Sequence, residues 1–173
     1  MKTNLWSSAA ANGLLLSLIT IIFTLFSTAF PTQNYAIIFL IWIVKLTATV
    51  GTLYFFMKGF GKPLDSYPYK TAFGYGFATS LCSNIVIACY LLLHYLIIFP
   101  DSMEKVTESM DKMMQAYPQY SENQATFDFI SKNMPIISAV SSFFIYTIVG
   151  LIIAAILANF AKKAEQPFAN EIE

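Results

Sequence analysis

One lysine, Lys45, and one asparagine, Asn84, stand in stretches of sequence that carry mostly apolar and small side chains. Lys45 follows residues 3–44, which contain 42 consecutive positions without a charge. An amine in such surroundings can bind an anion, carry a proton or pair with an acid on another subunit. In the alternative, Lys45 reaches toward water or is neutral, bonded to Asn84, hydroxyls or backbone carbonyls. Lys45 and Asn84 are therefore the candidate intramembrane polar site.

His94 is the single histidine and a candidate pH-sensitive group at the membrane interface. The alternative is a histidine bonded to water or to a tyrosine. No Cys, Asp or Glu stands beside it, so we expect no metal site of familiar type. Cys82 and Cys89 are seven residues apart on one predicted helix, roughly 10.5 Å along its axis, which is too far for a disulfide.

The sequence lacks the residue sets on which enzymes usually depend. Paired carboxylates in a pocket, a Ser-His-Asp set, a Cys-His pair and an intramembrane Asp-Asp pair are all missing. We therefore expect a protein that is not an enzyme, with no catalytic residue and no cofactor.

The composition indicates where these residues lie. Charged residues make up 12% of the 173 positions, against about 25% in an ordinary soluble domain. Ten Lys balance ten acids, with no Arg, so the chain lacks the basic surplus that binds nucleic acid. Disorder is also excluded, because the chain is apolar rather than charged. An integral membrane protein remains.

The uncharged run 3–44 is long enough for nearly two membrane crossings of about 20 residues each, and the uncharged runs 71–99 and 133–161 are long enough for one each. The first run is divided by Pro31-Thr32-Gln33-Asn34, which has the residues of a tight turn. We place the spans near 7–30, 35–57, 71–99 and 135–161, in a single membrane domain over 1–173. Ser27-Thr28-Ala29 resembles a signal-peptide cleavage site, but the single preceding Lys and the long apolar stretch favour a span.

Lys45 lies ten residues from the start of its span, about 15 Å along the helix. A central Lys costs roughly 2.5–3.5 kcal/mol of insertion free energy. The twelve Leu, Ile, Val and Phe residues of 35–57 return about 4–7 kcal/mol, so the span still inserts.

The distribution of Lys predicts the orientation of the spans. One side carries six lysines: Lys2, Lys58, Lys62, Lys70, Lys162 and Lys163. The other side carries residues 101–133, with three Lys and six acids. By the positive-inside rule both termini are cytoplasmic and the acidic segment is extracytoplasmic.

The segment 101–134 is predicted to be a helical hairpin between the third and fourth spans. Five residues at spacings of 3, 4, 3 and 4 share one face of its first helix: Met103, Val106, Met110, Met113 and Tyr117. This is the candidate partner-docking face, since Met suits adaptable contacts. The alternative is that the face packs on the second helix or lies at the membrane interface. Residues 58–70, with two Gly and two Pro, are predicted to form a structured turn.

Small residues recur every four positions in three of the spans. Such rows let helices approach closely in lipid, and we expect them to serve contacts within the chain rather than dimerisation. The rows are Ala9, Gly13 and Ser17; Ala72, Gly76, Ser80, Asn84 and Ala88; and Gly150, Ala154 and Ala158.

Several of these pieces, in this order, also occur together in a known family. They are Tyr69–Gly76, Tyr95–Pro100 followed by Asp101 and an acidic Met-bearing helix, and Gly150–Ile156 with Lys162-Lys163. On these residues the chain resembles a family of bacterial four-span membrane proteins of unknown function. The resemblance covers nearly the whole chain and implies a bacterial inner membrane; it brings no activity and no site residue.

The sequence thus predicts an all-α integral membrane bundle of four transmembrane helices with an extracytoplasmic helical hairpin. We expect a non-enzymatic accessory or assembly protein, whose partners are the lipid bilayer and a second copy or another membrane protein. The alternative is a small transporter or channel component that uses Lys45 and Asn84 and needs an oligomer to enclose a path.

Overall fold

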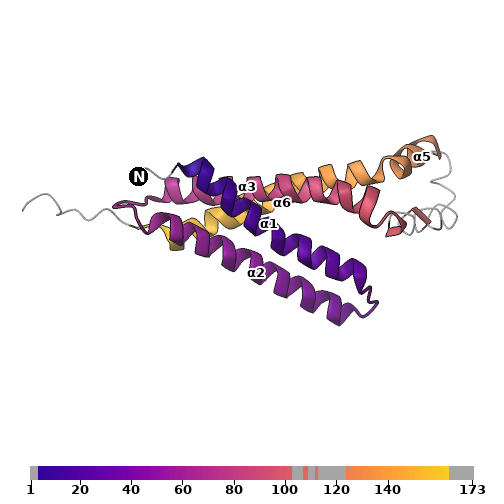
Figure 1. Ribbon diagram of the computed structural model, residues 1–173, viewed down its shortest axis with the longest axis horizontal. Helices are drawn as coiled ribbons and strands as arrows, with labels where there is room; N and C mark the ends of the chain where they lie inside the picture. The colour runs from indigo at the N-terminus through magenta and orange to yellow at the C-terminus, as the bar shows by residue number, and fades with distance from the viewer. Residues whose placement is uncertain (1–3, 103–106, 109–111, 113–123, 164–173) are drawn as a thin grey trace, which may run out of the picture. The chain divides into compact units, whose positions relative to one another are not determined.

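Four long apolar helices dominate the computed structural model, which describes residues 4–102, 107–108, 112 and 124–163 (Figure 1). They are α1 (Leu5–Ala29), α2 (Tyr35–Gly61), α3 (Tyr69–Leu93), which the π-helix η1 (His94–Ile98) continues, and α6 (Met134–Ala161). Each of the four segments is 25 to 30 residues long and apolar enough to cross a membrane. The predicted all-α, four-span fold is confirmed.

An asparagine side chain caps the N-terminus of each of the first two helices. Asn4 accepts a hydrogen bond from the Trp6 backbone nitrogen at 3.1 Å, and Asn34 accepts one from the Ala36 nitrogen at 3.0 Å. Each bond satisfies one of the backbone N–H groups that a helix start leaves unpaired. The predicted turn between the first two spans is therefore confirmed, and Asn34 is the residue that ends it.

Most of the described residues between α3 and α6 are helical, apart from Phe99, Pro100 and Asn133. Asp101, Ser102, Thr107, Glu108 and Lys112 have helical backbone, and α5 covers Gln124–Lys132. The predicted turn of the hairpin lies outside the described residues. So do all five residues of the candidate docking face, Met103, Val106, Met110, Met113 and Tyr117.

The predicted turn over 58–70 is shorter than expected, because α2 continues to Gly61 and α3 begins at Tyr69. Lys58 and the two glycines end the apolar run, so the sequence pattern predicts an earlier helix end. In the fold, the fully buried ring of Tyr67 lies directly against Gly61, where any Cβ would collide with it. A glycine is thus required inside the last turn of the helix by packing rather than by a bend.

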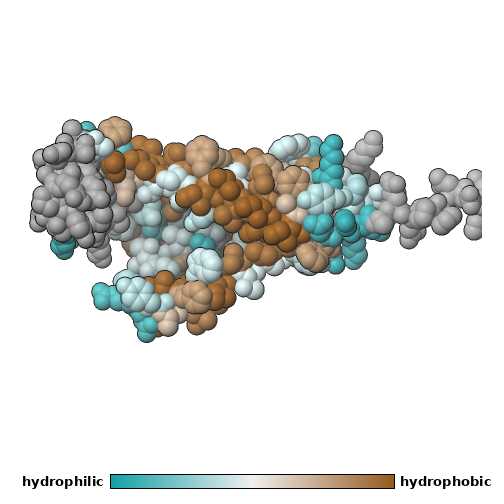
Figure 2. Space-filling view, turned by 180° about the vertical axis from the view of Figure 1, so that it is seen from behind, coloured by the Kyte–Doolittle hydropathy of each residue, from teal (hydrophilic) through white to brown (hydrophobic). Residues whose placement is uncertain are grey.

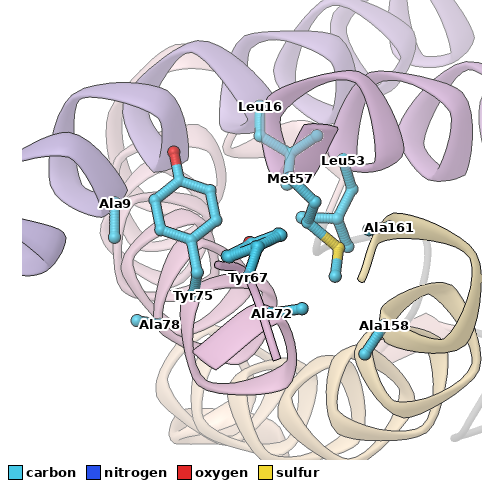
Figure 3. Packing of buried hydrophobic residues seen from close by; sticks show 10 residues of the cluster. All are labelled: Ala9, Leu16, Leu53, Met57, Tyr67, Ala72, Tyr75, Ala78, Ala158 and Ala161. Atoms are coloured by element: carbon cyan, nitrogen blue, oxygen red, sulfur yellow. The ribbon is translucent and has the colours of Figure 1, made fainter. Parts of the chain in front are cut away.

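The chain forms two compact units, Met1–Val86 with Ile145–Glu173, and Ile87–Phe144. In the first unit, α1 and α2 run antiparallel as a helical hairpin (Figure 1). Its core gathers residues from all four long helices and from the loop before α3 (Figure 3). The core residues are Ala9, Leu16, Leu53, Met57, Tyr67, Ala72, Tyr75, Ala78, Ala158 and Ala161.

Much of the remaining apolar surface of the spans is exposed (Figure 2), as expected of side chains that contact lipid. Lipid gives the helices no hydrophobic reason to associate, so contact between small residues must hold them together. A Cβ added to Gly13 of α1 would lie 2.8 Å from the Thr79 carbonyl oxygen of α3. One added to Gly150 of α6 would lie 2.9 Å from the Ser80 Cβ. The rows of small residues therefore make contacts within the chain, as predicted.

We expect Gly13→Ala to destabilise the bundle by about 1–3 kcal/mol, because the new methyl group meets backbone atoms of α3 that cannot move aside. Gly51→Ala is the matched control, since a Cβ at Gly51 meets nothing within 4 Å. Removal of a helical glycine there should stabilise by about 0.5–1 kcal/mol. Thermal unfolding of the detergent-solubilised protein measures both. A Gly13→Ala midpoint at or above that of Gly51→Ala would contradict this account of the packing.

Candidate functional site

Lys45 holds its amine in the middle of the span, over an aromatic ring of another helix. Its Nζ lies 5.9 Å from the ring centroid of Tyr146 in α6. Lys45 is 16 residues from the end of α2 and Tyr146 is 15 residues from the end of α6, or about 24 and 22 Å at 1.5 Å per residue. The half-buried amine therefore does not extend to the end of the helix. Its contact with the ring contributes about 0.5–2 kcal/mol, less than the insertion cost of a central Lys.

Asn84 is buried and forms a hydrogen bond with Thr147 of α6, the residue that follows Tyr146. Its amide nitrogen donates to the Thr147 hydroxyl at 3.4 Å, and the same nitrogen would be 3.7 Å from a Cβ at Gly150. Within the described part of the chain, no hydrogen bond joins Asn84 to Lys45. The direct pairing considered from the sequence is therefore not what the structure shows. The two residues approach adjacent residues of α6, each with a partner of its own.

The sequence did not reveal a second polar contact, which joins α1 to α3. The buried Tyr75 directs its hydroxyl toward α1 (Figure 3), where it lies 2.6 Å from the Asn12 amide nitrogen and 3.1 Å from the Ser8 hydroxyl. The Phe60 ring stacks on Tyr75 with centroids 4.0 Å apart. Ser8 and Asn12 are spaced four residues apart on one face of α1, which is the signal that could have indicated a shared partner.

The loop between α2 and α3 is tied to the end of α6. Tyr67 and Lys163 exchange backbone hydrogen bonds of 3.3 and 2.8 Å, and the Lys163 amine donates to the Leu64 carbonyl at 3.2 Å. The buried Tyr67 hydroxyl has no hydrogen-bond partner among the described residues. Burial, and then the neighbouring Tyr75, raise the pKa of Tyr67 above its ordinary value, so the phenol stays neutral.

His94 belongs to the second unit, at the first residue of the π-helix. Its side chain is buried, with Nδ1 2.9 Å from the Tyr90 hydroxyl. The rings of Tyr95 and Phe99 each lie with centroids 5.1 Å from its own. The alternative in which His94 bonds to a tyrosine is confirmed. Its sensitivity to pH stays a prediction.

Cys82 and Cys89 are both free, as their separation along the helix predicted. Cys82 instead packs against α1, where a Cβ at Gly13 would lie 2.7 Å from its own Cβ. Across the residues that the structure describes, no three His, Cys, Asp or Glu side chains gather as a metal-binding group.

Taken together, four apolar helices and the polar contacts between them define a multi-pass membrane protein. The family model of DUF4199, proteins of unknown function, matches residues 11–163, and the chain belongs to this family. The resemblance drawn from the sequence is therefore confirmed. Comparisons with curated proteins and with solved structures gave no match.

We expect the contact between Tyr75 and Asn12 to stabilise the bundle in a coupled way. Tyr75→Phe and Asn12→Ala should each lower the unfolding free energy, and the double variant should lose less than their sum. Hydrogen bonds between membrane helices give coupling energies of about 0.6 kcal/mol, up to about 1.7. Tyr35→Phe is the matched control, because Tyr35 is 87% exposed at the start of α2. Strictly additive losses would show that the bond carries no stability.

Proposed function

We propose that this protein is a non-enzymatic accessory or assembly protein of the bacterial inner membrane, which acts by binding another membrane protein. The proposal rests on one observation: polar side chains inside the bundle bond to other helices of the same chain. Tyr75 binds Asn12 and Ser8, and Asn84 binds Thr147, so these groups hold helices to one another. Side chains bonded in this way stabilise the fold. The exposed surface of the protein is therefore the part available to bind other molecules.

The transporter alternative receives less support from the same contacts. It requires Lys45 and Asn84 to line one path, yet the lysine lies over Tyr146 and the asparagine bonds to Thr147. The side chain of Asn84 is only 7% exposed and lies at the tight contact between α3 and α6, beside Gly150. These contacts favour a structural role for Asn84.

The proposed orientation places both termini in the cytoplasm. The contacts of Lys163 with Tyr67 and Leu64 bring the end of α6 to the loop that follows Lys62. The lysines of the α2–α3 loop and of the C-terminal segment therefore share one end of the first unit. A concentration of Lys at one end supports a cytoplasmic position for that end.

Single cysteines introduced into a Cys82→Ala, Cys89→Ala background test this orientation. Asp65→Cys lies in the α2–α3 loop, and Glu108→Cys lies between α3 and α6; both native residues are exposed. In intact spheroplasts, we expect a membrane-impermeant maleimide to label Glu108→Cys and to label Asp65→Cys only after permeabilisation. The two variants each remove one acid, so they are matched in charge. The reverse labelling pattern would contradict the orientation.

Site-specific crosslinking in native membranes tests the proposed binding role. A photoreactive residue in place of Trp42, which is 56% exposed on α2, should give a discrete adduct larger than the chain itself. The same residue in place of Leu16, which is 3% exposed, is the control and should give none. Co-expression of two differently tagged copies shows whether an adduct contains a second copy. Recovery of monomer alone, or of adducts between copies only, would contradict the proposal.

A further inference from the structure

Helix α2 presents the least covered surface of the four spans. Only 6% of its most apolar stretch is buried, against 28% for α1 and for the segment Tyr69–Ile98. Ile38 and Trp42 are 46% and 56% exposed on this helix. They precede Lys45 by seven and three residues, so the three side chains share one helix face. We call this face, made of Ile38, Trp42 and Lys45, the α2 lysine face.

The charge of Lys45, at one end of this face, has no counter-charge within the four spans. The four spans, 5–29, 35–61, 69–98 and 134–161, contain no Asp or Glu. The contact that the structure gives the Lys45 amine is the face of the Tyr146 ring, which attracts a cation but accepts no proton. Because Tyr146 also lies mid-span, this contact keeps the amine at that depth instead of letting it reach water.

A charged group held in the hydrocarbon is stabilised best by an opposite charge at the same depth. The spans of a second copy of this chain cannot supply one, because they contain no Asp or Glu either. The complementary group must therefore come from a different chain. Apolar residues beside the carboxyl would match Ile38 and Trp42, which both precede Lys45, and a transmembrane helix supplies such residues.

We infer that the α2 lysine face binds a transmembrane helix of another membrane protein, and that this helix carries an aspartate or glutamate at the depth of Lys45. The inference rests on the proposed function and names both the surface and the chemistry of the partner. The bound carboxyl group takes up the free side of the Lys45 amine, while the Tyr146 ring covers the other side.

Reconstitution with a synthetic helix tests the inference directly. The full chain, labelled with a fluorescent donor, is placed in neutral phosphatidylcholine vesicles with an acceptor-labelled leucine-based transmembrane peptide. The peptide carries Asp at its centre, and matched peptides carry Asn or Leu there. We expect energy transfer to report about tenfold tighter association of the Asp peptide than of the Leu peptide, with the Asn peptide between them.

Variants of Lys45 assign the effect to this residue. Lys45→Leu and Lys45→Gln should lose the preference for Asp, whereas Lys45→Arg should keep it. Lys45→Glu should reverse it, so that a peptide with a central Lys now binds better than the Asp peptide. Unfolding midpoints of all variants are measured alongside, and Lys45→Leu is expected to fold at least as stably as the natural chain, because it removes a central charge.

Two results would overturn the inference: equal association of the Asp and Leu peptides with the natural chain, or an Asp preference that survives in Lys45→Leu. Failure here is distinct from failure of the proposed function. If the chain shows no preference for the Asp peptide while a photoreactive residue at position 42 still crosslinks to another protein in native membranes, the accessory role is supported and a carboxyl-bearing partner helix is ruled out.

Discussion

Close approach of helix backbones at small residues is the constraint on which this bundle depends. Lipid tails are as apolar as Leu side chains, so association has to come from packing and hydrogen bonds. Gly13 brings α1 onto the backbone of α3, and Gly150 brings α6 onto Ser80. Both α1 and α6 therefore contact α3 through a glycine. At the end of α2, Gly61 leaves room for the buried ring of Tyr67, which is part of the core of the first unit.

The polar contacts follow from that approach. Tyr75 reaches Asn12 and Ser8 because α1 and α3 are close at Gly13, and Asn84 reaches Thr147 because α3 and α6 are close at Gly150. A polar group in lipid has little else to bind, so each of these bonds also fixes the rotation of its helix. Lys45 differs from them, because it lies on the least covered helix and, among the described residues, its amine meets the face of the Tyr146 ring.

Most of the secondary structure was predictable, because uncharged length alone specifies a membrane helix. The error over 58–70 arose where that signal ends: Lys58, Gly59 and Gly61 interrupt the apolar run, yet α2 continues to Gly61, which packs against Tyr67. The small-residue rows predicted the contacts within the chain. The partners of the candidate site residues were not predictable. Asn84 was considered for Lys45 on depth alone, and depth does not specify which way a helix is rotated.

Charge distribution along the chain was enough to establish four spans and the isolation of Lys45 from any acid in those spans, and the turn residues Pro31 to Asn34 established the turn between the first two. These properties follow from transfer free energies and hydrogen-bond satisfaction, which act on each segment separately. The pairing of Tyr75 with α1, of Asn84 with Thr147 and of Lys45 with Tyr146 came only with the folded bundle. Each of these depends on the rotation and approach of two helices, and that geometry is set jointly by side chains far apart in the sequence.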